Sequence, residues 1–192
     1  MYSSSPSKPY FNPSNNKYEF YQLKRAICQF SNGPIGIPPA GPSKNQNGTK
    51  RQSYVDNGYA ILTEYPDKTI ISLDLFNLPP GVHGFHIHEF GDFRKECDST
   101  GSHYNPFNKT HGGLNQPNNH LGDLGNITVD STGRCNSEIM VNYLPLNGPY
   151  SVVGRSMVIH SGPDDMGLGD HEDSKTSGHS GSRISCGVIG YL

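Results

Sequence analysis

Short β-rich runs, each bounded by turn-forming residues, constrain this chain more than any other feature. Pro66-Asp67 and Ser131-Thr132-Gly133 are two such boundaries, and both are typical of β-turns. The chain has 23 glycines, 15 prolines and no tryptophan, a composition that favours short strands over a helical bundle. We therefore expect an all-β fold whose strands are Leu23–Phe30, Tyr59–Tyr65, Thr69–Leu78, Val82–Phe90, Ile127–Asp130, Cys135–Val141, Val152–His160 and Ile184–Tyr191.

Two long polar segments, Gly91–Asp123 and Ser161–Ser182, interrupt the strand pattern. Long loops without secondary structure are uncommon in compact domains and are usually functional or disordered. A length of 192 residues fits one domain with loops or tails. We expect a flexible amino-terminal tail over residues 1–20 and one domain over residues 21–192. Gly33–Asn57 is so rich in Gly, Pro and polar residues that no strand is assigned there.

Charge and hydropathy argue against several kinds of partner. The formal net charge is −2, and no basic run suggests nucleic acid or an anionic membrane. No stretch of apolar residues is long enough for a transmembrane helix. Met1–Tyr18 has no apolar core of a secretory signal, so we expect a cytoplasmic protein. A mature chain from which a signal had been removed would look the same.

Histidines are concentrated in two places. In the expected strand Val82–Phe90, His86 and His88 project from one face while Phe85 and Ile87 project from the other. His160 ends another strand with the same alternation. An all-imidazole set with an open position suits copper that performs redox chemistry.

The first long segment supplies a second set of ligand types. His103, His111, His120 and Asp123 offer three nitrogens and one oxygen, which suits tetrahedral zinc. A lone histidine is usually a structural residue, and only the joint pattern indicates metal binding. We expect His83 to pack or to form hydrogen bonds, because it lies on the same face of the strand as Phe85 and Ile87. The other two histidines, His171 and His179, are expected to be solvated.

At these residues the sequence resembles the copper/zinc superoxide dismutase family of the eukaryotic type. The resemblance runs from about Lys24 to the end and is poor over Gly33–Asn57. It rests on Gly84-Phe85-His86-Ile87-His88-Glu89-Phe90-Gly91-Asp92, Gly101-Ser102-His103-Tyr104-Asn105-Pro106, His111-Gly112-Gly113, His120-Leu121-Gly122-Asp123-Leu124-Gly125-Asn126 and Gly181-Ser182-Arg183-Ile184-Ser185-Cys186-Gly187-Val188-Ile189-Gly190.

The resemblance implies an eight-stranded Greek-key β-barrel, an immunoglobulin-like sandwich with two long functional loops. It implies superoxide as the substrate and copper and zinc as cofactors, with His103 bridging the two metals. Asp164 matches a carboxylate that hydrogen-bonds one ligand of each metal, although a simple turn residue is the alternative. The implied ligands are His86, His88, His103 and His160 for copper, and His103, His111, His120 and Asp123 for zinc.

Two further features follow from the same resemblance. Of the four cysteines, Cys97 and Cys186 match an intrasubunit disulfide, an exception to the usual reduced state of cytosolic thiols, while Cys28 and Cys135 are expected to be free. Arg183 matches a cation that attracts the anionic substrate towards copper.

The expected reaction converts superoxide to oxygen and hydrogen peroxide, with His103 and Arg183 as the catalytic residues. The alternative is a dismutase-like copper-binding or copper-delivery domain without turnover; such domains often lack copper ligands or the arginine. All four copper-type histidines and Arg183 are present here. The resemblance also implies a homodimer, with small or apolar residues at Gly91, Val153, Gly154, Val188 and Gly190.

We also predict that a copper chaperone is dispensable. In family members that depend strictly on the chaperone, proline tends to lie next to the arginine that precedes the second cysteine. Proline fixes φ and removes a backbone donor, which can hold that segment away from unassisted closure of the disulfide. Ser182–Cys186 contains no proline.

Overall fold

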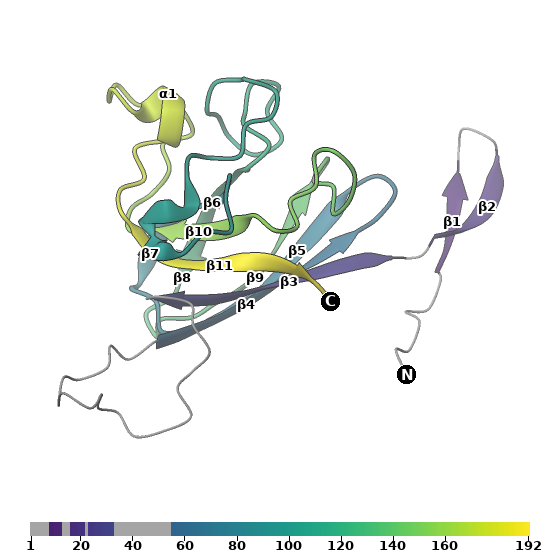
Figure 1. Ribbon diagram of the computed structural model, residues 1–192, viewed down its shortest axis with the longest axis horizontal. Helices are drawn as coiled ribbons and strands as arrows, with labels where there is room; N and C mark the ends of the chain where they lie inside the picture. Colours follow the sequence, from purple (N-terminus) through teal and green to yellow (C-terminus); the bar gives the residue numbers. More distant parts are fainter. Residues whose placement is uncertain (1–7, 13–15, 22, 33–54) are drawn as a thin grey trace.

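The computed structural model describes residues 8–12, 16–21, 23–32 and 55–192 (Figure 1). Eight antiparallel strands form one sheet in the order β8-β6-β10-β11-β3-β4-β5-β9, and the sheet curls into a nearly closed barrel in which β8 and β9 contact each other. The predicted all-β Greek-key barrel is therefore confirmed. Its strands are β3 (Lys24–Asn32), β4 (Val55–Glu64), β5 (Thr69–Leu75), β6 (Gly81–His88), β8 (Asp123–Val129), β9 (Cys135–Val141), β10 (Ser156–His160) and β11 (Arg183–Tyr191).

The barrel interior is filled by the inward-facing residues of these strands. In β5 every second side chain is buried, as a strand with one face on the core requires. Phe30 of β3 and Phe85 of β6 lie near each other in this core, with ring centroids 6.0 Å apart. The largest fully buried side chains are Phe30, Phe85, Leu62, Ile71, Leu75, Ile87, Leu124, Leu144, Leu146, Met157, Ile159 and Ile189.

β6 ends at His88 rather than Phe90, and β10 and β5 are also shorter than the sequence predicted, each for a local reason. β10 begins at Ser156 rather than Val152, because Gly154 has a φ of 87° and the backbone turns before it. β5 ends at Leu75 because Asn77 has a φ of 56°. The side chain of Asn57 then donates hydrogen bonds to the carbonyl oxygens of Phe76 and Asn77.

The strand that could not be assigned within Gly33–Asn57 begins at Val55. β4 pairs antiparallel with β3 along its length, and residues 33–54 lie outside the described residues. At Gly58, where φ is 91°, a Cβ atom would lie 2.1 Å from the carbonyl oxygen of Asp74 on β5. Glycine is therefore required at this close approach of two strands.

The amino-terminal region contains a hairpin where the sequence indicated a flexible tail. β1 (Lys8–Asn12) and β2 (Lys17–Tyr21) pair with each other and with no barrel strand in the described part of the chain. Asn16, with a φ of 56°, precedes β2. The missed signal was the tyrosine and phenylalanine content of Lys8–Asn12 and Lys17–Tyr21, which favours strands. A domain boundary near residue 20 stays a prediction.

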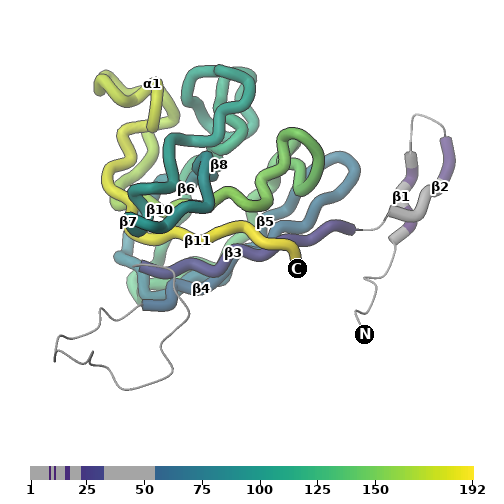
Figure 2. Tube along the Cα trace, viewed as in Figure 1, coloured from purple at the N-terminus to yellow at the C-terminus, as the bar shows by residue number. Residues whose placement is uncertain are grey.

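Both long loops rise on one side of the barrel (Figure 2). The first carries the short strand β7 (Arg94–Cys97) and the 3-10 turn η1 (Asp98–Thr100), and the second carries α1 (Ser174–Ser177). Among the described residues, no helix has the length and apolar character needed to cross a membrane.

Candidate metal centre

The strand β6 presents a pair of buried imidazoles to the face outside the core. His86 and His88 lie on the same side of the strand with ring centroids 6.4 Å apart, whereas Phe85 and Ile87 belong to the core. Both imidazoles are almost fully buried, because the two loops cover this face of the barrel. The strand period of two residues therefore places the pair as the sequence indicated.

His160 joins this pair because β10 lies beside β6. Val158 is paired with His86 in the sheet, so His160, two residues further along β10, has the same orientation. The Nε2 atoms of His160 and His88 lie 3.3 Å apart. Two buried ring nitrogens at this separation can bind the same metal ion.

His103 completes this group and belongs to a second one. It forms an isolated β-bridge with His88, and its ring centroid lies 3.9 Å from that of His86. Its Nδ1 atom lies on the other side, 2.9 Å from Oδ1 of Asp123. The two nitrogens of one imidazole thus face two different clusters.

The second cluster is organised around the carboxylate of Asp123, the first residue of β8. Oδ1 lies 2.9, 3.0 and 3.2 Å from Nδ1 of His103, His111 and His120, respectively. Oδ2 accepts hydrogen bonds from the backbone N–H groups of Gly112 and His120. In each four-residue group, one candidate ligand atom per residue lies within 4.8 Å of all the others: His86, His88, His103 and His160 in the first, and His103, His111, His120 and Asp123 in the second.

Asp164 connects the two groups. Its Oδ2 accepts a hydrogen bond from Nε2 of His86 at 2.9 Å, and its Oδ1 accepts one from Nε2 of His111 at 2.8 Å. Asn126 holds the backbone of Asp164 at both its N–H and its carbonyl group. Since Nε2 of each histidine is occupied, Nδ1 of each is directed into its own cluster.

The donor atoms of the two groups fit metal ions. His86 Nδ1, His103 Nε2, His111 Nδ1 and His120 Nδ1 are buried and form no hydrogen bond. Nδ1 of His111 and Nδ1 of His120 lie close to Asp123 Oδ1, at a spacing that suits three ligand atoms of one metal ion. An unsatisfied buried nitrogen is costly, and imidazole is a common ligand of both copper and zinc, so these atoms fit two bound ions.

The protonation states suit the same purpose. Burial lowers the pKa of His86 to about 3 and that of His160 to about 4, and it also lowers the pKa of His88 and His103. These imidazoles are therefore neutral at neutral pH, the form that binds a metal. His111 differs: burial acts to lower its pKa, but the neighbouring carboxylates of Asp123 and Asp164 raise it to about 9.

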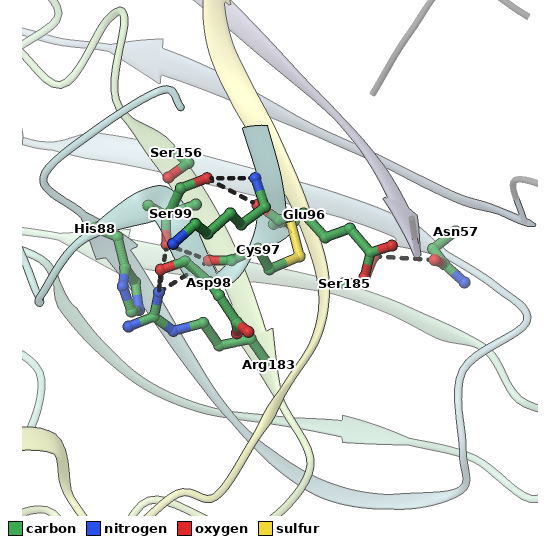
Figure 3. Close-up of a disulfide and its surroundings, with 12 residues drawn as sticks. Asn57, His88, Glu96, Cys97, Asp98, Ser99, Ser156, Arg183 and Ser185 are labelled. Carbon is green, nitrogen blue, oxygen red and sulfur yellow. Dashed lines mark hydrogen bonds between the residues drawn. A yellow bond between two sulfur atoms is a disulfide. The ribbon is translucent and has the colours of Figure 1, made fainter. Parts of the chain in front are cut away.

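Arg183 lies at the edge of the first group and is tied to the first loop (Figure 3). Its guanidinium donates to the carbonyl oxygens of Cys97, Asp98 and Gly101 and to the hydroxyl of Thr100. The Gly101 carbonyl oxygen also lies 2.9 Å from Nδ1 of His88. The arginine is thus half-buried and held in one orientation, which the sequence did not reveal.

A disulfide joins Cys97 at the end of β7 to Cys186 in β11, with Cα atoms 5.9 Å apart (Figure 3). It fixes the loop whose carbonyl groups hold Arg183. Cys28 and Cys135 are free and buried, as expected. Burial raises the pKa of the Cys28 thiol, so this thiol stays protonated.

The three remaining histidines lie outside both groups. His83 is buried, and its Nδ1 and Nε2 atoms lie 2.7 and 2.8 Å from the carbonyl oxygens of His160 and Pro79. It therefore forms hydrogen bonds rather than ligating a metal, as its position in the strand indicated. His171 and His179 are exposed, and their rings stack on each other.

A β-barrel that carries two buried ligand groups sharing one histidine defines a class of bimetallic enzymes. Residues 56–189 match the family described as copper/zinc superoxide dismutase (SODC). The chain therefore belongs to the copper/zinc superoxide dismutase family, as its motifs indicated. It is an oxidoreductase that dismutates superoxide, with copper and zinc as its cofactors.

Two known proteins illustrate the similarity. "Superoxide dismutase [Cu-Zn] 3" of Arabidopsis thaliana is 48% identical over 122 residues, which is 64% of this chain and 74% of that protein. The crystal structure of the clock protein EA4 has a TM-score of 0.73 and 35% sequence identity, and it covers 92% of this chain and 99% of that chain. The alternative of a binding domain without turnover is not favoured by these similarities.

Proposed function

We propose that the two groups hold different metals. The nitrogen-only group of His86, His88, His103 and His160 would hold copper, and the group containing Asp123 would hold zinc. When bound, copper supplies a one-electron redox couple, whereas zinc has no second oxidation state to offer. The shared residue His103 is the observation that carries this proposal, because its two nitrogens face the two groups.

His103 is proposed to move the proton. Two superoxide anions and two protons give one oxygen molecule and one hydrogen peroxide molecule. Nδ1 of His103 faces the Asp123 cluster, while Nε2 would take up one proton and pass it to the reduced superoxide; water would supply the second proton. Burial lowers the pKa of His103, so its Nε2 atom carries no proton at neutral pH and is free to face the first group.

Arg183 is proposed to attract and orient the anion. Its guanidinium is a fixed cation that donates a hydrogen bond to the carbonyl oxygen of Gly101, and Nδ1 of His88 contacts the same oxygen. An opposite charge fixed beside a reaction site raises the encounter rate of a small anion.

Reconstitution with both metals tests the assignment. Protein stripped of metal and then supplied with copper and zinc should take up one ion of each per chain and gain superoxide-dismutating activity. If zinc binds and copper does not, even with copper in excess, the copper assignment is wrong. Metal content and turnover are measured on the same sample, so a loss of one without the other identifies the failing step.

The chain is also proposed to form a homodimer. Gly91, Gly154 and Val188 lie together on one exposed face: a Cβ atom on Gly91 would approach the Gly154 carbonyl oxygen and the Val188 side chain. Val188 is 37% exposed although it lies in the middle of β11. A surface of small and apolar residues on the barrel suits close contact between two copies.

Cytoplasmic location and maturation without a copper chaperone are further proposals. In support of the second, Arg183, Ser185 and Cys186 pair in the sheet with β10, and the segment contains no proline that would disturb this pairing. Expression in cells that lack the chaperone, with copper supplied, should give active and disulfide-bonded protein. Reduced, inactive protein that the chaperone rescues would refute the proposal, and cell fractionation tests the location.

A further inference from the structure

The outer face of the second long loop carries a pair of histidines that the metal centre does not use. His171 and His179 flank the short helix α1, and their rings stack with centroids 3.6 Å apart and planes 10° apart. All nine histidines of the chain fall within the described residues, and the other seven are buried. Only these two imidazoles are therefore accessible to an ion in solution.

A carboxylate holds one of the two rings in the tautomer that metal ligands adopt. Nδ1 of His179 donates a hydrogen bond to Oδ1 of Asp173 at 2.7 Å. The hydrogen atom therefore lies on Nδ1, and the lone pair of Nε2 is free. A metal-binding histidine commonly donates its other ring nitrogen to a carboxylate in this way. The same hydrogen bond lowers the pKa of Asp173 and keeps it charged.

The backbone fixes both rings relative to α1. His179 has a φ of 49°, in the left-handed region that few residues with side chains adopt, and it follows Gly178 with a φ of 67°. On the other side of α1, the backbone N–H of His171 donates to Ser174 Oγ, and its carbonyl oxygen accepts from the N–H of Ser174. The rings are thus brought together by the fold of the loop.

Further oxygen ligands lie beside the pair. A surface hollow of about 490 Å³ is lined by His171, Glu172, Asp173, Thr176 and His179. No hydrogen bond to the Glu172 carboxylate or to the His171 ring is found in the part of the chain described here. Two imidazoles and a carboxylate are ligand types that Cu²⁺, Zn²⁺ and Ni²⁺ accept.

We propose that His171 and His179, supported by Asp173 and Glu172, bind one divalent transition-metal ion on the outer face of this loop. The lone pair of each nitrogen lies in its ring plane, so the two parallel rings would have to rotate out of their stack before both could bind the same ion. The ion then links the two ends of α1.

The site has a mechanical consequence for the metal centre beneath it. Gly178, at the end of α1, packs so tightly on Asp164 and His111 that a Cβ atom there would lie 1.9 Å from Asp164 Oδ1 and 2.5 Å from His111 Nε2. An ion that links the ends of α1 therefore holds Gly178 against the residues that connect the two buried groups.

Nickel binding to the untagged enzyme, fully loaded with copper and zinc, tests the proposal. Equilibrium dialysis against Ni²⁺ should show one nickel per chain while the copper and zinc contents stay constant. His179→Asn should abolish this uptake, because asparagine tolerates the left-handed backbone but supplies no imidazole. Asp173→Asn should weaken nickel binding by about 10-fold, the usual effect of losing the carboxylate behind a histidine ligand.

Thr176→Ala is the matched control, since Thr176 lines the same hollow without an imidazole, and it should bind nickel as the wild type does. Hydrogen exchange of residues 171–180 should slow on addition of Ni²⁺ in the wild type and in Thr176→Ala, and not in His179→Asn. Wild-type enzyme that takes up no nickel overturns the proposal. So does nickel uptake matched by loss of zinc or copper, or equal nickel affinity in His179→Asn.

Discussion

His103 is the residue on which both ligand groups depend. The remaining ligands belong to one group only, so single substitutions should separate the two metals. His160 belongs to the nitrogen-only group because its strand, β10, pairs with β6, which carries His86 and His88. His120 belongs to the loop and contacts Asp123.

We therefore expect His160→Ala to abolish turnover and to leave one zinc per chain. His120→Ala should instead lose zinc and loosen the first long loop, because Asp123 no longer has its full set of partners. Elemental analysis and a superoxide assay on both variants give the comparison. Loss of both metals in both variants would show that the groups are not separable.

Asp164 should affect both metals at once. Asp164→Asn retains the size of the side chain but removes the charge that accepts hydrogen bonds from His86 and His111. Affinity for each metal should fall by about 10- to 100-fold, the range found when such supporting carboxylates are removed. Competition with a chelator measures both affinities, and Asp67→Asn in an exposed turn is the control. An effect on one metal alone would contradict the shared role.

Arg183 has two roles that can be told apart. Its four hydrogen bonds hold the first loop, and its charge attracts the substrate. Arg183→Lys retains the charge but not the planar fork of donors, so it should lower the melting temperature while retaining a decline of kcat/KM with salt. Arg183→Glu should flatten or reverse that decline. Equal salt profiles for the wild type and Arg183→Glu would show that the charge does not steer superoxide.

At the scale of elements, the disulfide is the main constraint on the first loop. It joins β7 to β11 across a sequence separation of 89 residues. In the chain-entropy description, closing a loop of this length stabilises the protein by about 4–5 kcal/mol. Cys97→Ser should therefore lower the free energy of unfolding by up to about that amount, as measured by denaturant titration. Cys135→Ser, which breaks no bond between elements, is the control; an equal loss in both would contradict this.

The strands were more predictable than the contacts between loops. Alternating patterns such as that of Phe85 and Ile87 against His86 and His88 follow directly from the two-residue period of a strand. The hydrogen bonds of Arg183 go to backbone carbonyl groups, and these carry no residue-specific signal. The distance between Asp164 and His111 likewise depends on how two long loops fold over the barrel, which no periodicity encodes.

At the scale of the whole molecule, the exposed face around Val188 should govern assembly. Light scattering of the wild type should give about twice the chain mass of 21.0 kDa. Val188→Asp should give the mass of one chain, because a charge buried between two copies is costly. Val82→Asp, at an exposed valine on β6, should leave the dimer intact. A monomeric wild type at micromolar concentration would contradict the proposed dimer.

The position of Asp164 also bears on how such a protein can diverge. Because one carboxylate serves a histidine of each ligand group, selection on either metal alone is sufficient to preserve it. A lineage that lost copper binding through mutations at His88 or His160 would still need Asp164 to orient His111. The carboxylate should therefore outlast the copper ligands in descendants that retain only zinc.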